Sequence, residues 1–136
     1  MNVLSVASFA TIVSDVKATH ALYRDALGIA FEGEVGDYIF TGKLDGAKHL
    51  GLWPLSEAAE ACFGTPEWPA DLTTPQASIE FEVMDVPAAA AAELQAAGHR
   101  LIHETRTEPW GQVIARVLDP NGLIVGVTFT PWMHEA

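Results

Sequence analysis

Two glutamates, Glu80 and Glu82, are the acidic side chains best placed to do chemistry in this sequence. They lie in the segment SIEFEV, where polar and apolar residues alternate, so both face the same side of a predicted strand as Ser78. If that side lines a cavity, the pair forms a negative wall that attracts a cation or serves as a general base. If it is the exposed edge of a sheet, the two carboxylates are simply solvated.

His49 is the histidine that the pattern places nearest to such a cavity, because it precedes Gly51 by two residues on the predicted strand AKHLGLWPL. A hydrogen-bonded structural histidine is the alternative. His134 is expected in a mobile C-terminal tail. The sequence has no HxH, HxxE or CxxC spacing, no Ser-His-Asp motif and no phosphate-binding glycine loop. Its one HxxxH spacing joins His99, which follows a helix-ending glycine, to His103 on the next predicted strand, so the two do not share a helix face. The common signatures of metal, nucleophile and nucleotide sites are therefore missing.

Aromatic side chains at several places could form flat walls for a ligand. Trp110 opens the PWGQ turn, Trp53 ends the strand LGLWPL, and Trp68 lies in an acidic, proline-rich segment. Tyr38 and Phe40 share strand parity and could form another wall. Core packing is the alternative for each of these aromatic residues.

An internal repeat indicates which elements position these side chains. ASFATIVSDVKATHALYRDALG from Ala7 and ASIEFEVMDVPAAAAAELQAAG from Ala77 align at a constant offset of 70 residues. Each copy reads as a strand followed by a helix. Asp15 and Asp85 are predicted N-caps, Pro87 fits a first helical turn, and Gly28 and Gly98 fit the left-handed position after a helix.

Further strands follow each helix, with turns at Gly36-Asp37, Asp45-Gly46 and Asn121-Gly122. The predicted strands are IAFEGE, GDYIFTGKL and AKHLGLWPL in the first half, and RLIHETRT, GQVIARVLD and LIVGVTFTP in the second. The sequence therefore predicts an α+β fold, a single domain over 1–136 made of two tandem βαβββ modules. The modules span 1–54 and 77–136, and the linker 55–76 is predicted to hold a short helix at SEAAEACF.

The composition of the chain, above all its net charge, limits the kinds of binding partner. The chain has 136 residues, 49% of them hydrophobic, and a formal net charge of −11, which makes nucleic acid and anionic membranes poor partners. We see no apolar run long enough to span a membrane. The single Cys62 excludes an internal disulfide and favours a reducing cytoplasm. The acidic balance serves either solubility or attraction of a cationic ligand.

The duplicated βαβββ module, with its D-V-x-A helix start and its PWGQ…DPNG hairpin, resembles the vicinal oxygen chelate superfamily. That group contains glyoxalase I, extradiol dioxygenases and the bleomycin-resistance proteins. The resemblance implies curved mixed sheets around a concave cavity. It aligns the family's metal-ligand positions with Ser8, Gly51, Ser78 and Gly126, which cannot replace imidazole or carboxylate. We therefore expect no metal or other cofactor, and a cavity widened by the missing side chains.

Two functional classes follow from the resemblance. The first is non-enzymatic sequestration of a flat, cationic small molecule, of the antibiotic-resistance or self-protection type, with Trp110 at the position of a ligand-stacking tryptophan. The second is a lyase, isomerase or dioxygenase with relocated or no metal ligands, with His49, Glu80 and Glu82 as its candidates; a housekeeping domain with an unknown ligand is a third possibility. The resemblance also implies a two-fold homodimer. The residues expected to bind ligand are Tyr38, Phe40, His49, Gly51, Trp53, Trp68, Ser78, Glu80, Glu82, Trp110 and Gly126.

Overall fold

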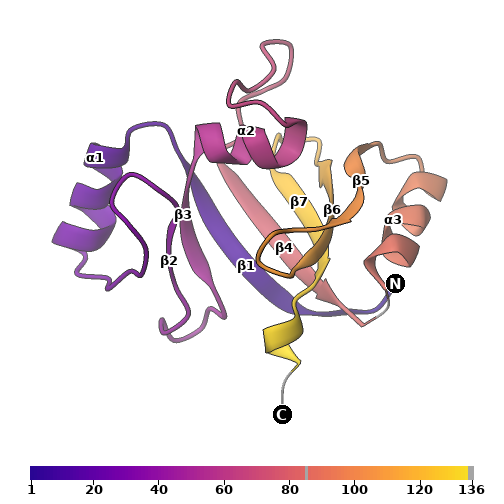
Figure 1. Ribbon diagram of the computed structural model, residues 1–136, viewed down its shortest axis with the longest axis horizontal. Coiled ribbons are helices and arrows are strands. Elements are labelled where there is room, and N and C mark those ends of the chain that lie inside the picture. The colour runs from indigo at the N-terminus through magenta and orange to yellow at the C-terminus, as the bar shows by residue number, and fades with distance from the viewer. Residues whose placement is uncertain (85, 135–136) are drawn as a thin grey trace.

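The computed structural model describes residues 1–84 and 86–134 and contains one seven-stranded mixed sheet (Figure 1). The strand order is β2-β3-β1-β4-β7-β6-β5, so β2 and β5 are edges and the sheet is open. This architecture confirms the predicted α+β class. The strands are β1 Val3–Val13, β2 Ile39–Thr41, β3 Leu50–Pro54, β4 Ala77–Val83, β5 Leu101–Thr107, β6 Val113–Leu118 and β7 Ile124–Phe129.

The helices begin and end largely where the sequence signals place them. The Asp15 side chain accepts a hydrogen bond from the Ala18 amide at 3.0 Å and caps α1 (Val16–His20), which continues as the π-helical turn η1 (Ala21–Ala26). The predicted linker helix is present as α2 (Leu55–Phe63). Pro87 opens α3 (Pro87–Ala96) as predicted, whereas the predicted cap Asp85 lies outside the described residues. A final 3₁₀ turn, η2, spans Pro131–Met133.

The two halves of the chain meet at the centre of the sheet. β1 and β4 are antiparallel, with Ser8 opposite Glu80 and Ala10 opposite Ser78. β3 runs parallel to β1 on one side, and β7 runs parallel to β4 on the other. Because β4 is a central strand, the glutamates of SIEFEV do not lie on an exposed sheet edge.

The first half has fewer strands than predicted. The segment IAFEGE forms only an isolated bridge between Glu32 and Phe40, and β2 is limited to three residues. Gly33 has a φ of 110°, and a Cβ atom there would lie 2.7 Å from the Tyr38 carbonyl oxygen. This close approach of two backbones ends the regular strand geometry. The second half forms all of its predicted strands.

Helices cover the outer face of the sheet at both ends and leave the inner face to the cavity. α3 packs on Val83, Ala115 and Val127, and α1 with η1 packs on a cluster around Ile39 and Leu52. α2 lies instead over one end of the inner face, where Ala58 and Cys62 pack against Ile124. Within residues 1–84 and 86–134, no helix combines the length and apolar character needed to cross a bilayer.

Candidate functional site

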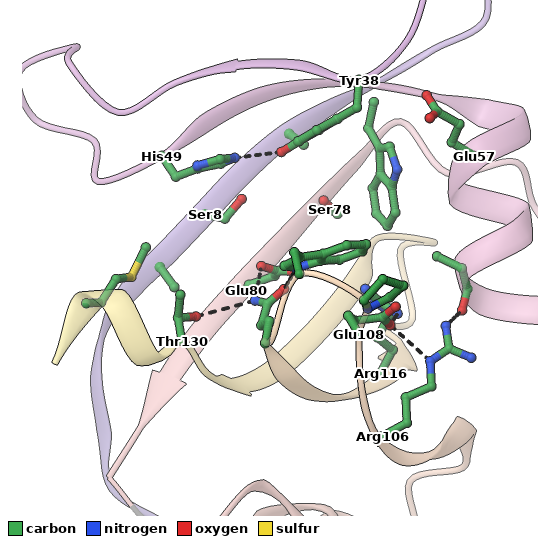
Figure 2. Close-up of a pocket in the computed structure, with 18 of the residues that line it drawn as sticks. Ser8, Tyr38, His49, Glu57, Ser78, Glu80, Arg106, Glu108, Arg116 and Thr130 are labelled. Carbon is green, nitrogen blue, oxygen red and sulfur yellow. Dashed lines mark hydrogen bonds and ion pairs between the residues drawn. The ribbon is translucent and has the colours of Figure 1, made fainter. Parts of the chain in front are cut away.

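A cavity of about 430 Å³ opens on the inner face of the sheet, within the range of small-molecule sites (Figure 2). β1, β3 and β4 contribute to its floor, while β5, β6 and the turn between them, α2 and η2 contribute to its walls. Most of its surface is apolar or aromatic, and a few polar groups converge in it. The lining residues are Ala7, Ser8, Ala10, Tyr38, His49, Trp53, Glu57, Glu60, Ala61, Ser78, Glu80, Arg106, Glu108, Pro109, Trp110, Gln112, Arg116, Thr130, Trp132 and Met133.

Glu80 is the carboxyl group on the cavity floor. Gln112 donates from Nε2 to Glu80 Oε1 at 3.0 Å, and the Trp110 indole N–H donates to Gln112 Oε1 at 2.9 Å. The indole thus fixes the amide, and the amide fixes the carboxyl. Burial raises the pKa of Glu80, against the opposing effects of Arg116 and of the Gln112 hydrogen bond. The arrangement therefore holds one oriented carboxyl group whose neutral form is favoured by burial.

Tyr38 and His49 form a second polar pair. The Tyr38 hydroxyl and His49 Nε2 are 2.7 Å apart and share one hydrogen bond. Phe40 stacks on His49 with ring centroids 5.0 Å apart, so it supports the pair from behind. Burial raises the pKa of Tyr38 and lowers the pKa of His49. Both groups are therefore neutral at physiological pH, and they supply hydrogen bonds and flat surface rather than charge.

A charged network that the sequence reasoning did not identify lies along β5 and β6. Arg116 is buried, and its Nη1 donates to Glu108 Oε1 and to His103 Nε2, each at 3.1 Å. The Arg116 guanidinium carbon lies 5.6 Å from the centre of the Trp53 ring. Arg106 donates to the same Glu108 oxygen at 2.9 Å and also to the Ala61 carbonyl. Glu108 thus pairs with both cationic side chains of the cavity wall.

A sequence signal for part of this network exists. In the strand GQVIARVLD, Gln112, Ile114 and Arg116 share strand parity, which puts two polar side chains on the inner face. Glu57 on α2, and Trp132 and Met133 in η2, were also missed. Alternation along a strand could not predict these residues, because they lie on a helix and in a C-terminal turn.

Six of the predicted ligand-binding residues line the cavity, and five do not. Phe40 lies behind His49, and Trp68 packs edge-on against Phe63 while its indole N–H donates to the Thr73 carbonyl at 3.1 Å. Glu82 faces the same side as Glu80 but is buried beneath the C-terminal turn, where Thr130 N donates to its Oε2 at 2.6 Å. The lining six are Tyr38, His49, Trp53, Ser78, Glu80 and Trp110.

Gly51 and Gly126, the other two, do not widen the cavity as expected. A Cβ atom at Gly51 would collide with the Tyr38 ring, and one at Gly126 would lie 2.9 Å from Ile114 Cδ1 and 3.2 Å from Glu80 Cγ. Neighbouring side chains therefore fill the space that each glycine leaves. The glycine inside strand β7 lets the Glu80 side chain lie against the backbone.

The residues present do not fit the metal centre that the family resemblance implies. Ser8 and Ser78 line the cavity, but the Tyr38 ring occupies the space beside Gly51, and Gly126 has no side chain. Among the described residues, no group of three or more His, Cys, Asp or Glu side chains is arranged to hold a metal ion.

Comparison with known proteins agrees with this fold. The model of a glyoxalase-like domain matches residues 7–130. No curated protein is significantly similar to the chain in sequence.

Several solved structures share the fold at low identity. A glyoxalase/bleomycin resistance protein/dioxygenase superfamily member from Vibrio splendidus 12B01 is 16% identical, with a TM-score of 0.58 over 90% of this chain and 97% of that one. A methylmalonyl-CoA epimerase from Streptomyces coelicolor, in complex with 2-nitronate-propionyl-CoA, is 17% identical, with a TM-score of 0.58 over 99% and 100%. A Legionella pneumophila protein described as an NAD-dependent benzaldehyde dehydrogenase is 10% identical, with a TM-score of 0.57 over 90% and 96%.

These structural likenesses concern the fold alone. The family model, by contrast, spans nearly the whole sequence and covers the strands that line the cavity. This chain belongs to the glyoxalase-like domain family.

Proposed function

We propose that this protein binds a flat, cationic small molecule in its cavity and sequesters it without catalysis, as a resistance or self-protection protein would. The observation that carries the proposal is the Glu80 carboxyl group, held on the floor of a cavity walled by aromatic rings. A cation above Glu80 would stabilise the ionised carboxylate, which burial alone disfavours. Tyr38, Trp53 and Trp110 offer ring faces for stacking and cation–π contact.

The charges around the cavity favour the same ligand class. Its lining contains four glutamates and two arginines. Both arginines form ion pairs with Glu108, whereas Glu57, Glu60 and Glu80 form no ion pair in the described part of the chain. The net charge of −11 adds a long-range attraction for cations, which salt screens beyond about 8–10 Å. An anionic ligand would be repelled at long range by the net charge of the protein and at short range by the glutamates of the cavity.

The test is a fluorescence titration of the purified protein against a panel of flat aromatic cations and shape-matched neutral and anionic analogues. We expect quenching of tryptophan fluorescence by cations at micromolar concentration, which corresponds to about −8 kcal/mol. Glu80→Gln should weaken cation binding about tenfold and leave neutral analogues unaffected. The proposal fails if the best ligand is an anion, or if Glu80→Gln binds the cations normally.

The orientation of Glu80 also favours a second candidate, a metal-independent isomerase or lyase. A carboxyl group with a raised pKa, fixed by Gln112, suits a general base that removes a proton beside a carbonyl group. An epimerase is among the proteins that share the fold. The acidic lining, however, opposes a polyanionic thioester of coenzyme A. Incubation with methylmalonyl-CoA in D₂O distinguishes the two: deuterium incorporated at the acidic carbon by wild type, and lost in Glu80→Gln, would favour the enzyme.

We further propose that binding needs no transition metal and takes place in the cytoplasm, where the free, buried thiol of Cys62 would stay reduced. Elemental analysis of protein purified without an affinity tag tests the first point. A stoichiometric metal whose removal by a chelator abolishes ligand binding would contradict it.

A further inference from the structure

A second carboxyl group reaches the cavity from a different element than Glu80. Glu57 lies in the first turn of α2, and Figure 2 shows it on the helix beside the cavity, while Glu80 rises from the strands of the floor. Its Oε2 atom is buried and has no hydrogen-bond partner within residues 1–84 and 86–134. A buried carboxylate oxygen without a partner is costly, so this atom marks a place where a ligand donor would be stabilised.

Glu57 and Glu80 both act on Tyr38, and neither forms an ion pair in the described part of the chain. The charge of each carboxylate raises the pKa of Tyr38, which shows that both lie within electrostatic reach of its phenol. The ion pairs of the described residues leave out both glutamates. Burial raises the pKa of Glu57 and Asp37 raises it further, against a hydrogen bond from the Tyr38 backbone that lowers it. Burial is thus the main cause of the raised pKa of both carboxyl groups.

The surface between them is aromatic and fixed in shape. The rings of Tyr38 and Trp53 meet edge to face, with centroids 6.3 Å apart and an interplanar angle of 71°. The Tyr38 hydroxyl is held by His49, and Trp53 is held by the Arg116 guanidinium. A rigid, flat ligand body matches such a surface better than a flexible chain, because it loses less conformational entropy on binding.

We propose that Glu57 and Glu80 are two cation subsites of one cavity, and that the preferred ligand is a rigid aromatic dication. This inference rests on the proposed function, since it assigns the second charge of the same ligand. An amidinium or guanidinium group at each end would donate N–H bonds to one carboxylate, and the aromatic body would lie against Tyr38 and Trp53. Specificity would then come from the pair of carboxyl groups, because a monocation can satisfy only one of them.

Calorimetric titration with two matched probes tests the proposal: biphenyl-4-carboxamidine, a monocation, and biphenyl-4,4′-dicarboxamidine, a dication. We expect wild type to bind the dication about tenfold more tightly, the usual scale of one buried charge-assisted hydrogen bond. Glu57→Gln should remove this preference by lowering the dication affinity to about that of the monocation. The matched control is Glu104→Gln, which removes the same charge from an exposed carboxyl group on β5 that does not line the cavity, and it should keep the preference.

Proton release gives a second readout. Binding of a cation forces a carboxyl group of raised pKa to ionise, so at mildly acidic pH the dication should release more protons than the monocation. Calorimetry in two buffers of different ionisation enthalpy measures the difference, which should disappear in Glu57→Gln.

The outcomes separate the two proposals. If the monocation binds through Glu80 but the dication binds no better, the second subsite is refuted and the proposed function stands. If Glu104→Gln abolishes the preference as fully as Glu57→Gln, general surface charge explains it and the second subsite is again refuted. If neither probe binds, and no flat cation of the panel binds either, both proposals fail together.

Discussion

At the scale of single residues, the cavity is organised by what its polar groups hold in place. The Glu80 carboxyl is oriented by Gln112, which is itself oriented by the Trp110 indole N–H. Gly126 leaves room for the Glu80 side chain, and Gly51 leaves room for the Tyr38 ring. A strand glycine that weakens its own strand thus permits a polar side chain to lie against the sheet.

Trp110 is the residue whose loss should reduce affinity most directly. Its side chain is 54% exposed although it lines the cavity, so its ring face is available to a ligand. Trp110→Ala would remove this face and also the hydrogen bond that fixes Gln112. We expect binding of a flat cation to weaken by about 1–3 kcal/mol, measured by calorimetry.

Trp68 provides the control for that experiment. It lies outside the cavity and packs against Phe63, so Trp68→Phe keeps an aromatic ring in the cluster and should leave affinity unchanged. If Trp110→Ala bound the flat cation with normal affinity, Trp110 would not be part of the binding site.

Glu80 should lower the stability of the protein at neutral pH. Because its pKa in the folded state is raised above the ordinary value of 4.5, its contribution to stability is present below that pH and is lost as pH rises through the raised pKa. Glu80→Gln removes the titration and keeps an oxygen that accepts from Gln112. We expect the variant to melt about 3 °C higher than wild type at pH 8, corresponding to about 1 kcal/mol, with the difference vanishing near pH 4.

Glu104→Gln is the matched control for the pH dependence, since Glu104 is exposed on β5. Thermal unfolding followed by circular dichroism across this pH range measures both variants. A stabilisation of Glu80→Gln that grows as pH falls would contradict the account.

At the scale of elements, the alternation of side chains along strands predicted much of the site. It did not predict the site residues that lie on helices or turns. Ser78, Glu80 and His49 were found because they alternate with core residues on strands or their flanks. The prediction of a strand at IAFEGE was wrong, because the local alternation of residues does not reveal that Gly33 packs against the backbone at Tyr38. Glu57 could not be assigned from the sequence, because the orientation of α2 depends on its contacts with Ile124 across the sheet.

The C-terminal turn is an element whose role the sequence did not indicate. His134 was expected in a mobile tail, but its Nε2 lies 2.7 Å from Glu82 Oε2, and its ring stacks on Phe129 with centroids 4.2 Å apart. The same carboxylate oxygen accepts from Thr130 N. These contacts hold η2 in place, so that Trp132 and Met133 form part of the cavity wall.

We therefore expect His134→Ala to loosen this wall and to speed ligand release severalfold, with little change in the association rate. Stopped-flow fluorescence with a flat cation measures both rates. His99→Ala is the control, because His99 is exposed and follows α3. Unchanged release in His134→Ala would mean that η2 keeps its place without the hydrogen bond between His134 and Glu82.

At the scale of the whole molecule, the outer face of the sheet exposes apolar side chains between the two flanking helices. Figure 1 shows β1 and β4 at the centre, with α1 and α3 toward opposite ends. Val6 and Phe9 of β1 are 46% and 40% exposed, and their partners across the β1–β4 pair are Phe81 and Ile79. Contiguous apolar surface of this kind is typical of an interface.

We propose that a second copy of the chain covers this face in a two-fold homodimer, the assembly that the sequence analysis predicted. The antiparallel β1–β4 pair suits an isologous contact, because the same strands then meet on both subunits. The sheet edges are less suitable, since β2 has three residues and β5 has irregular register.

Light scattering at micromolar concentration should give twice the chain mass of 14.6 kDa for wild type and the single mass for Phe9→Glu. Val35→Glu places the same charge on an exposed loop and should remain dimeric. A wild-type protein of 14.6 kDa under these conditions would exclude the dimer, and a dimeric Phe9→Glu would place its interface elsewhere.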